Sequence, residues 1–393
     1  MAVNTMTFNQ LATVLASITS QATGKTALTA TDTASFVSVA KTALETGYDP
    51  LATAISQVLS RTIFSVRPYS RKFRGLEADA IRYGNHVRKL NYVDKPFEED
   101  DRIKLVDGQS VDQYKVNKPK VVQTNFYGAN IYQKGVTIYR DQLDCAFSGV
   151  EEFERFLSGL MQNASDMLEQ ARENTSRATL ANLIGGHVAL DAAETTSDCV
   201  IHLITEYNAY SRESVTAETV FGPDVFPAFA KWLYGRIKTL SKMLQERTAT
   251  HHLNLTAGDI MRHTPVEDQR LYMLGGTADQ VETNVLSTLF NEDYMKLIPY
   301  EEVMFWQSIQ SPDALNLTAG YTNAAGAATS GAVNKTGVFG VLMDREAAGV
   351  TLVNQWAAPT PFNARGGYYN QYWHETARYW NDFTEKAVVL ILD

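Results

Sequence analysis

Residues 337–348 read Gly-Val-Phe-Gly-Val-Leu-Met-Asp-Arg-Glu-Ala-Ala, residues 363–369 read Asn-Ala-Arg-Gly-Gly-Tyr-Tyr, and residues 386–392 read Lys-Ala-Val-Val-Leu-Ile-Leu. The first and last segments contain apolar runs with the length and composition of buried β-strands. Between them lie a short alanine-rich piece and a Gly-Gly turn. This layout predicts a β-rich C-terminal part with a structural role, because no group of its side chains is arranged for chemistry.

The composition is that of a globular protein with room for more than one core. The chain has 393 residues, of which 45% are hydrophobic and 20% are charged, so it can form two or more lobes. The formal net charge is 35 − 44 = −9, which is opposite in sign to a coat that neutralises DNA phosphates. If the protein surrounds DNA, it does so by walling it in.

The cysteine content and the lengths of the apolar runs exclude disulfide-rich and membrane-spanning proteins. The chain contains only Cys145 and Cys199, which favours two reduced thiols and excludes a disulfide framework or a cysteine-based metal site. The longest apolar runs are far below the ~18 residues that span a bilayer. We therefore expect no membrane partner.

The first 60 residues predict an N-terminal arm. Helical periodicity appears over 8–15 and 36–44, and Gly24 and Gly47 interrupt it. Large apolar side chains are too few to form a separate core. The arm must therefore lie on the body of its own chain or on a neighbouring subunit.

The next part of the chain predicts a long two-stranded projection over about 80–130. Segments 86–93, 110–115 and 120–127 have β-type composition, and Asp107-Gly108 is a good hairpin turn signal. An isolated hairpin of this length is not stable in water. We therefore expect it to lie on a partner surface.

Charges along this projection are segregated into a basic block followed by an acidic run. We predict that the basic block of one subunit meets the acidic run of another, with a plain solvated surface as the alternative. The predicted interface residues are Arg67, Arg71, Arg74, Arg88, Lys89, Glu98, Glu99, Asp100 and Asp101.

A long helix is predicted over 148–185. Apolar residues recur at helical spacing from Phe153 to Leu183, Ser148 and Glu151 form a capping-box pattern, and Gly185-Gly186 is a stop signal. At 1.5 Å per residue such a helix is ~54 Å long. We interpret it as a strut, because polar interruptions break the heptad pattern of a coiled coil.

The remaining segments predict a second lobe and a returning tail. Residues 200–205 read as a short strand or helix, 225–245 as a helical pair, 270–276 as a buried strand with a glycine stop, and 279–290 as a helix. The small, polar residues of 311–336 predict a loop. The C-terminal strands are expected to return to the first lobe.

No catalytic, cofactor-binding or metal-binding residue is predicted. Gly24-Lys25-Thr26 lacks the glycine-rich cradle of a phosphate loop. His251, His252 and His263 lack metal-site spacing, and His374-Glu375 reads as a cross-strand polar pair. The chain also has no nucleophile elbow, so we expect no enzymatic activity.

The order of arm, charged hairpin, strut helix, α/β lobe and β tail resembles the major capsid protein of tailed bacteriophages (Hong Kong ninety-seven type coat fold). Segments 339–347 and 363–367 are the most specific points of likeness. The resemblance implies an α+β fold with five parts. These are an arm (1–60), an extended β-hairpin loop with flanking strands (61–140), a peripheral domain with a spine helix (141–195), an axial domain (196–310), and a loop with a C-terminal β return to the peripheral domain (311–393).

The same resemblance implies a function and partners. The protein would self-assemble into pentamers and hexamers of an icosahedral shell that encloses double-stranded DNA. Separate scaffolding, portal and decoration proteins would be its other partners. It would be assembled in the host cytoplasm and located in the virion.

Three alternatives remain open at the level of sequence. The first is an encapsulin-like compartment, which shares the fold and packages enzymes. The second is another virion part, such as a tail or portal protein. The third is a hydrolase or carbohydrate-binding protein, which predicts a monomer or small oligomer with a deep pocket.

Overall fold

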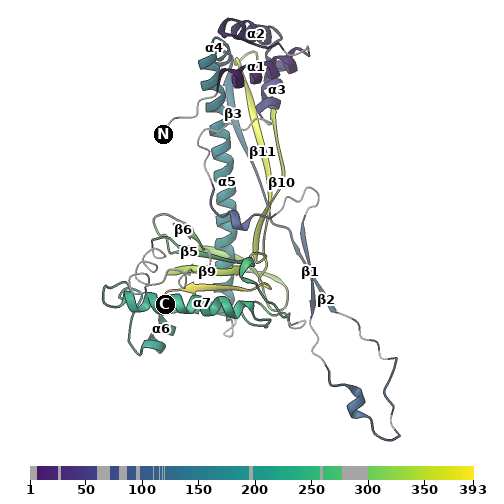
Figure 1. The fold of residues 1–393 in the computed structure, drawn as a ribbon, viewed down its shortest axis with the longest axis vertical. Helices are drawn as coiled ribbons and strands as arrows, with labels where there is room; N and C mark the ends of the chain where they lie inside the picture. Colours follow the sequence, from purple (N-terminus) through teal and green to yellow (C-terminus); the bar gives the residue numbers. More distant parts are fainter. Residues whose placement is uncertain are drawn as a thin grey trace.

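The structure, a computed structural model, describes residues 7–24, 28–59, 71–78, 86–93, 98–108, 110–114, 116, 118, 120–193, 198–256, 260–276 and 300–393. A tall spine carries a helical cluster at one end and an α/β lobe at the other, and a thin hairpin leaves the spine sideways near the lobe (Figure 1). No helix in these ranges is both long and apolar enough to cross a membrane.

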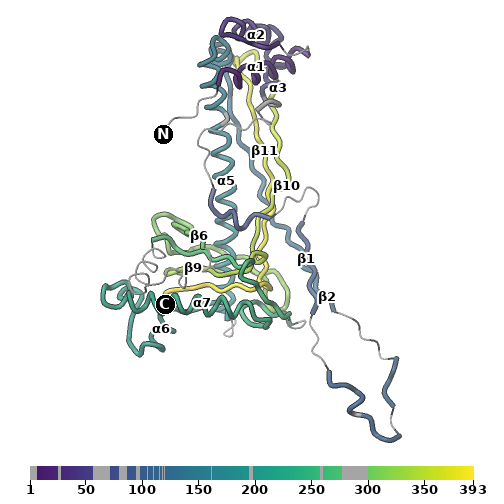
Figure 2. The backbone as a smooth tube through the Cα atoms, viewed as in Figure 1, coloured from purple at the N-terminus to yellow at the C-terminus, as the bar shows by residue number. Residues whose placement is uncertain are grey.

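The spine consists of helix α5 (Val150–Ala193) packed on an antiparallel sheet. The sheet order is β10 (Ala348–Pro359), β11 (Tyr368–Asn381) and β3 (Ala129–Tyr139). The register pairs Tyr368 with Tyr139 at one end and Arg378 with Ala129 at the other. The tube in Figure 2 shows β10 and β11 running side by side along the spine.

The predicted helix stop at Gly185-Gly186 is wrong, because α5 continues through both residues. A Cβ at Gly186 would lie 2.4 Å from Cζ of Phe383, and one at Gly185 would lie 3.1 Å from Leu317. The two glycines therefore serve close packing inside the helix. Glycine marks such approaches as well as helix ends.

The predicted capping box at Ser148 and Glu151 is also not formed. The Ser148 hydroxyl instead donates to the Cys145 carbonyl (2.6 Å) at the end of α4 (Arg140–Ala146). The Gly149 carbonyl accepts the first backbone hydrogen bond at the start of α5, from Phe153. Ser148 thus terminates one helix, and does not begin the next.

The N-terminal segment folds back on its own chain as three helices. These are α1 (Phe8–Thr23), α2 (Thr33–Glu45) and α3 (Tyr48–Leu59). Leu15 and Phe36 are fully buried and share a core with Phe153 of α5, whose ring meets Phe36 edge-on at 5.6 Å. As expected, the segment has no separate core. It packs on the body of its own chain, which was one of the two possibilities that the sequence left open.

The hairpin is shorter than the alternating sequence predicts. Strands β1 (Val87–Val93) and β2 (Lys120–Phe126) confirm two of the predicted segments, and they pair from Val87–Phe126 to Val93–Lys120. Between them lies a short 3₁₀ helix, η2 (Asp101–Lys104), and Gly108 turns with φ +81°. The strand predicted over 110–115 is not formed by residues 110–114.

The lobe is built on a five-stranded mixed sheet in the order β4 (Val200–His202), β12 (Ala387–Ile391), β9 (Val338–Asp344), β5 (Gln269–Leu274) and β6 (Tyr300–Val303). Both faces of its central strands are buried. Val388 and Leu390 pack with α6 (Leu203–Ser211) and α7 (Phe226–Gln245), whereas Val389 and Ile391 face the lower spine. The tail contributes to both parts, because β10 and β11 pair with β3 in the spine whereas β9 and β12 are central strands of the lobe.

Two further predictions in this lobe are wrong. The helical pair predicted over 225–245 is the single helix α7. The loop predicted over 311–336 contains the hairpin of β7 (Leu315–Thr322) and β8 (Ala328–Lys335), which packs on α5 and buries Leu315, Ala319 and Val333. The strand predicted over 270–276 is confirmed by β5, and the helix predicted over 279–290 lies outside the described residues.

Candidate functional site

The base of the hairpin is anchored to the body by Lys89 on β1. Its Nζ lies 3.0 Å from Oε2 of Glu346 and 3.1 Å from Oδ2 of Asp382, and it also donates to Glu385. The side chains of Asp382 and Glu385 are almost fully buried. Burial alone lowers the pKa of Lys89, but the three carboxylates outweigh it and the net pKa is raised.

Arg262 forms a second anchor beside the first. It donates to Oδ1 of the buried Asn91 (2.8 Å) and to the Thr384 carbonyl (3.2 Å), and it lies 3.0 Å from Oε1 of Glu385. Burial raises the pKa of Glu385, and the two cations only partly oppose this shift. Lys89 and Asn91 are therefore the inward positions of β1.

The alternate positions of β1 point outward, as strand geometry requires. Arg88, Leu90 and Tyr92 are exposed, and Tyr92 lies opposite the exposed Val121 of β2. The loop beyond the strands adds further exposed apolar side chains, namely Ile103, Leu105, Val106, Val111, Tyr114 and Val116. The projection thus presents a nonpolar surface that its own chain leaves uncovered.

Arg71 is also an anchor within the chain. It pairs with Glu77 and with Glu169 of α5, and donates to Oε2 of Glu77 at 2.6 Å. The hydrogen bond to Glu77 is the main reason that the pKa of Arg71 is raised. Arg74 is exposed in the 3₁₀ helix η1 (Arg74–Leu76), and Arg67 lies outside the described residues.

The acidic run lies on the exposed loop of the projection. Asp100 accepts from the Arg102 backbone N–H (2.9 Å) and pairs with the Arg102 guanidinium (2.5 Å). These hydrogen bonds lower the pKa of Asp100. Glu98, Glu99 and Asp101 are exposed.

A charged cavity of about 470 Å³ lies where the hairpin meets the body. Arg88, Arg270 and Arg345 line it together with Lys89, and Glu77 and Glu346 contribute the carboxylates. Arg345 lies 3.2 Å from Asp268 and keeps about half of its side chain exposed. The cavity could accept carboxylates from another molecule.

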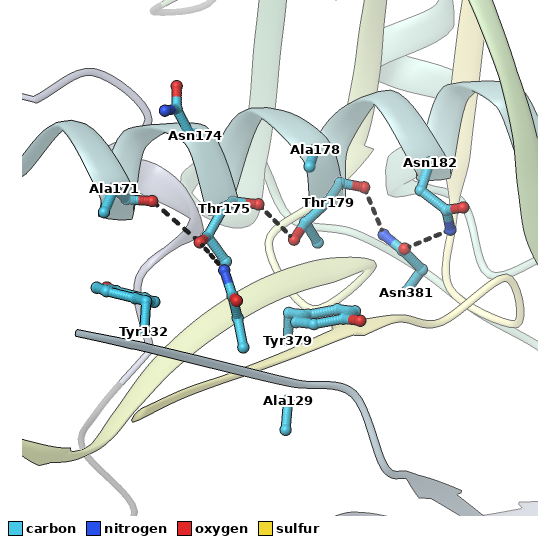
Figure 3. A pocket seen from close by; sticks show the side chains of 11 residues that line it. Ala129, Tyr132, Ala171, Asn174, Thr175, Ala178, Thr179, Asn182, Tyr379 and Asn381 are labelled. Carbon is cyan, nitrogen blue, oxygen red and sulfur yellow. Dashed lines mark hydrogen bonds between the residues drawn. The ribbon is translucent and has the colours of Figure 1, made fainter. Parts of the chain in front are cut away.

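A second cavity, of about 540 Å³, lies between α5 and the spine sheet (Figure 3). Asn130 donates to Oγ1 of Thr175 (2.8 Å), and Asn381 donates to the Thr179 carbonyl (2.9 Å) and accepts from Asn182 (2.8 Å). None of its lining residues is ionisable except tyrosines. Such a lining can bind polypeptide, but it offers no acid–base pair or nucleophile for catalysis.

Comparison with known proteins decides between the alternatives. A model of the Phi29-like phage major capsid protein family matches residues 13–391. This chain belongs to that family. Its members are structural coat proteins, which separates the chain from the proposed hydrolases, carbohydrate-binding proteins and tail or portal proteins.

Solved structures show the same fold. A chain of the capsid structure of Staphylococcus phage Andhra is 11% identical with a TM-score of 0.54, and the match covers 84% of this chain and 87% of that one. A chain from the structure of the head fibre and inner core protein gp22 of native bacteriophage P68 is also 11% identical, with a TM-score of 0.50 and the same coverages. No curated protein sequence matches the chain. The resemblance proposed from sequence is confirmed.

Several buried polar groups of this phage coat subunit were missed at the level of sequence. Glu375 is fully buried in the spine, where it binds Tyr132 and accepts from Arg172 at 2.7 and 2.5 Å. Glu169 links this pair to Arg71, because Arg172 lies 2.9 Å from its Oε1. The His374-Glu375 dipeptide hinted at this site, but the partner Arg172 is distant in sequence and not recognisable.

His374 and His252 pack against other parts of the protein. His374 stacks on Trp356 with ring centroids 3.9 Å apart, and His252 is buried. Among the described ranges, no group of three or more His, Cys, Asp or Glu residues could hold a metal ion. Gly24 ends α1 with φ +64°, and Lys25 and Thr26 lie outside the described residues.

Proposed function

We propose that this capsid protein assembles into pentamers and hexamers of a closed icosahedral shell that encloses double-stranded DNA. Rotational closure of heterologous contacts between identical subunits yields such rings. The net charge of −9 supports enclosure without sequence-specific contacts to DNA. In this proposal residues 141–195 belong to the peripheral domain and residues 196–310 to the axial domain.

The observation that carries the proposal is the uncovered projection. Leu90 and Tyr92 expose more than half of their side chains on a two-stranded ribbon. A ribbon of two strands gains too little from its own pairing to be stable alone. A neighbouring subunit that covers these side chains would remove their apolar surface from water. The projection is therefore the principal intersubunit contact.

Opposite charges would align this contact. We place the acidic run of one subunit against the basic surface around the charged cavity of its neighbour. The acidic side is Glu98, Glu99, Asp100 and Asp101; the basic side is Arg67, Arg74 and Arg88, with Arg270 and Arg345. Arg71 and Lys89 support this interface from within, because they hold residues 71–78 and the hairpin base in place.

Other partners and the place of assembly follow from the same role. Scaffolding, portal and decoration proteins would be separate chains, and assembly would take place in the host cytoplasm before the coat becomes part of the virion. The protein would carry out no enzymatic reaction and hold no cofactor. Its chemistry is the formation of many weak, repeated contacts.

The test is particle formation by the purified chain, followed by sedimentation and negative-stain microscopy. We expect uniform closed shells from the wild type and loss of shells from the Arg74→Glu/Arg88→Glu variant at moderate salt. The added changes Asp100→Lys/Asp101→Lys should restore assembly, whereas Arg155→Glu, an exposed position on α5, should leave it unchanged. A wild type that stays monomeric under all assembly conditions would refute the shell. Normal shells from the Arg74→Glu/Arg88→Glu variant would refute the charge pairing and leave the shell standing.

A further inference from the structure

The charged cavity lies where the hairpin leaves the spine near the lobe (Figure 1), and several elements form its wall. Arg88 comes from β1, Arg270 from β5, and Arg345 from the turn between β9 and β10. Strand β11 adds Trp380, and residues 75–78 close a further side. A ligand that bound the three guanidinium groups would therefore join the hairpin to the lobe.

The two carboxylates that line this cavity are already held by cations of the same chain. Glu77 pairs with Arg71, and Oε2 of Glu346 lies 3.0 Å from Nζ of Lys89. Neither carboxylate is therefore needed as the partner of an arginine in the wall. An anion that entered the cavity would meet guanidinium groups as its nearest uncompensated charges.

Two of the three arginines have no carboxylate partner among the described residues. Arg88 is exposed and forms no ion pair with any of them, and Nη1 of Arg270 donates to two backbone carbonyls at 2.8 and 2.9 Å. Nε of Arg345 lies 3.2 Å from Asp268, and 56% of the Arg345 side chain is exposed. Guanidinium N–H groups that remain available bind oxygen-rich anions through pairs of parallel hydrogen bonds.

Gly75 leaves the Arg270 side chain uncovered on the cavity side. A Cβ at this position would lie 3.4 Å from Cδ and 3.6 Å from Nε of Arg270, and 2.9 Å from the Tyr272 hydroxyl. That hydroxyl is buried and has no hydrogen-bond partner among the described residues. Any larger residue at position 75 would press on both side chains, so glycine keeps this part of the wall open.

The size and the donors of the cavity favour a compact ligand with several phosphate groups. Its volume of about 470 Å³ falls in the range of small-molecule sites. Arginine forks match phosphate oxygens in geometry, and three forks from three elements suit several anionic groups that lie close together. The indole of Trp380 adds an apolar wall, and its Nε1 donates to the Glu346 carbonyl (3.3 Å).

We propose that the charged cavity binds a polyphosphate through Arg88, Arg270 and Arg345, and that the bound polyphosphate delays assembly. The anion neutralises the basic surface that the acidic run of a neighbour meets, so subunits associate after it leaves. The delay rests on the proposed shell and its charge pairing, whereas the binding does not. The recognised chemistry is a chain of phosphates, supplied by inorganic polyphosphate or by a nucleoside triphosphate.

Titration calorimetry of the free subunit with tripolyphosphate tests the binding site. We expect one site per subunit at low ionic strength, with an affinity that Arg88→Gln and Arg270→Gln each reduce about tenfold or more. Arg155→Gln, at an exposed ion pair of α5, should leave the affinity unchanged. The exposed position of Arg88 makes its variant the one that keeps the fold, and unfolding temperatures without ligand verify this. No binding by the wild type, or an equal loss in Arg155→Gln, would overturn the proposal.

A parallel titration with ATP distinguishes the two sources of phosphate. Equal affinities for ATP and tripolyphosphate would support a site for the phosphate chain alone. Tighter binding of ATP would support a nucleotide whose base lies against Trp380. Much weaker binding of both than of inorganic sulfate would overturn a site built for several phosphates.

Shell assembly with and without saturating tripolyphosphate tests the delay. The wild-type yield should fall about tenfold, and sodium chloride at the same ionic strength should reduce it less, because general screening acts on all exposed charges. An equal loss in sodium chloride would overturn the delay and leave the binding site standing. If the wild type binds tripolyphosphate but forms no shells under any condition, the proposed function fails and the site remains.

Discussion

The spine and the hairpin use similar residues in opposite ways. In the spine, Arg172 and Glu375 are enclosed between helix and sheet, and Leu157 is fully buried. In the hairpin, Arg88, Leu90 and Tyr92 are exposed, whereas Lys89 and Asn91 turn toward the body. The ion pairs of the spine are satisfied within one chain, whereas the outward face of the hairpin is left for the neighbouring subunit of the proposed shell. Stability and assembly should therefore respond to different substitutions.

The largest loss of stability is expected in the spine. Glu375→Ala leaves the largely enclosed Arg172 guanidinium and the Tyr132 hydroxyl without their common partner, so the free energy of unfolding should fall by about 3 kcal/mol. Urea denaturation of the free subunit measures it. The matched control is Glu152→Ala, whose ion pair with Arg155 is exposed and should change stability by less than about 1 kcal/mol. Equal effects of the two substitutions would contradict an enclosed spine.

Acid should weaken the lower spine through His187. This residue of α5 is fully buried, has no hydrogen-bond partner at either ring nitrogen, and packs against Phe383. Burial lowers the pKa of His187 from 6.5 to about 4. Between these pH values the unfolded chain binds a proton that the folded chain does not. Stability is therefore fully present above pH 6.5 and falls as the pH drops toward 4, by about 3 kcal/mol.

Replacement by leucine isolates this contribution. His187→Leu should remove that part of the pH dependence and leave the part due to carboxylates. Denaturation midpoints of both proteins between pH 7 and 4 provide the measurement. Parallel curves would show that His187 is not neutral and enclosed in the folded subunit.

Substitutions at the adjacent residues Lys89 and Arg88 of β1 separate effects on subunit stability from effects on shell assembly. Lys89→Met removes the cation that faces Asp382, Glu385 and Glu346, so the subunit should lose about 1–3 kcal/mol of stability and also assemble poorly. Arg88→Met, one residue away on the outward face, should leave stability within about 0.5 kcal/mol yet reduce shell formation. Thermal unfolding and sedimentation of both variants give the two readouts. A stability loss at Arg88 as large as that at Lys89 would remove the distinction between inward and outward positions.

The smallest change in stability is expected for glycine-to-alanine substitutions at two positions of α5. Gly186→Ala places a Cβ against the Phe383 ring and should destabilise the subunit by about 1–2 kcal/mol, less than a full overpacking cost because alanine also favours the helix. Gly159→Ala meets no atom within 4 Å and should stabilise it by up to about 1 kcal/mol. Effects of the same sign in chemical denaturation would show that close packing does not explain the glycine pair.

Sequence patterns identified elements whose side chains repeat regularly. The periodicity of α5, the apolar run of β5 and the alternation of β1 and β2 each reflect one buried face, so the residues themselves carry the signal. The hairpin of β7 and β8 was missed because its buried residues include small ones such as Ala319, which fit beneath a helix but also occur in loops. Whether such small residues are buried depends on the surface that covers them, which the sequence of the hairpin itself does not show.

The interface prediction shows the same limit. Charge runs predicted a basic surface and an acidic loop, but they could not show that Arg71 and Lys89 would be held by carboxylates distant in sequence. The alternation along β1 does carry this information once the strand is known. The helices of residues 8–59 rest on their own body, so the intersubunit contact that we propose lies on the hairpin and its loop.

Removal of the loop tests the central claim most directly. Val93 pairs with Lys120, so residues 94–119 can be replaced by Asn-Gly, which closes a two-residue hairpin turn without changing the ladder. We predict a subunit with unchanged unfolding temperature that forms no closed shells under conditions where the wild type does. Closed shells in normal yield from the shortened chain would contradict the account.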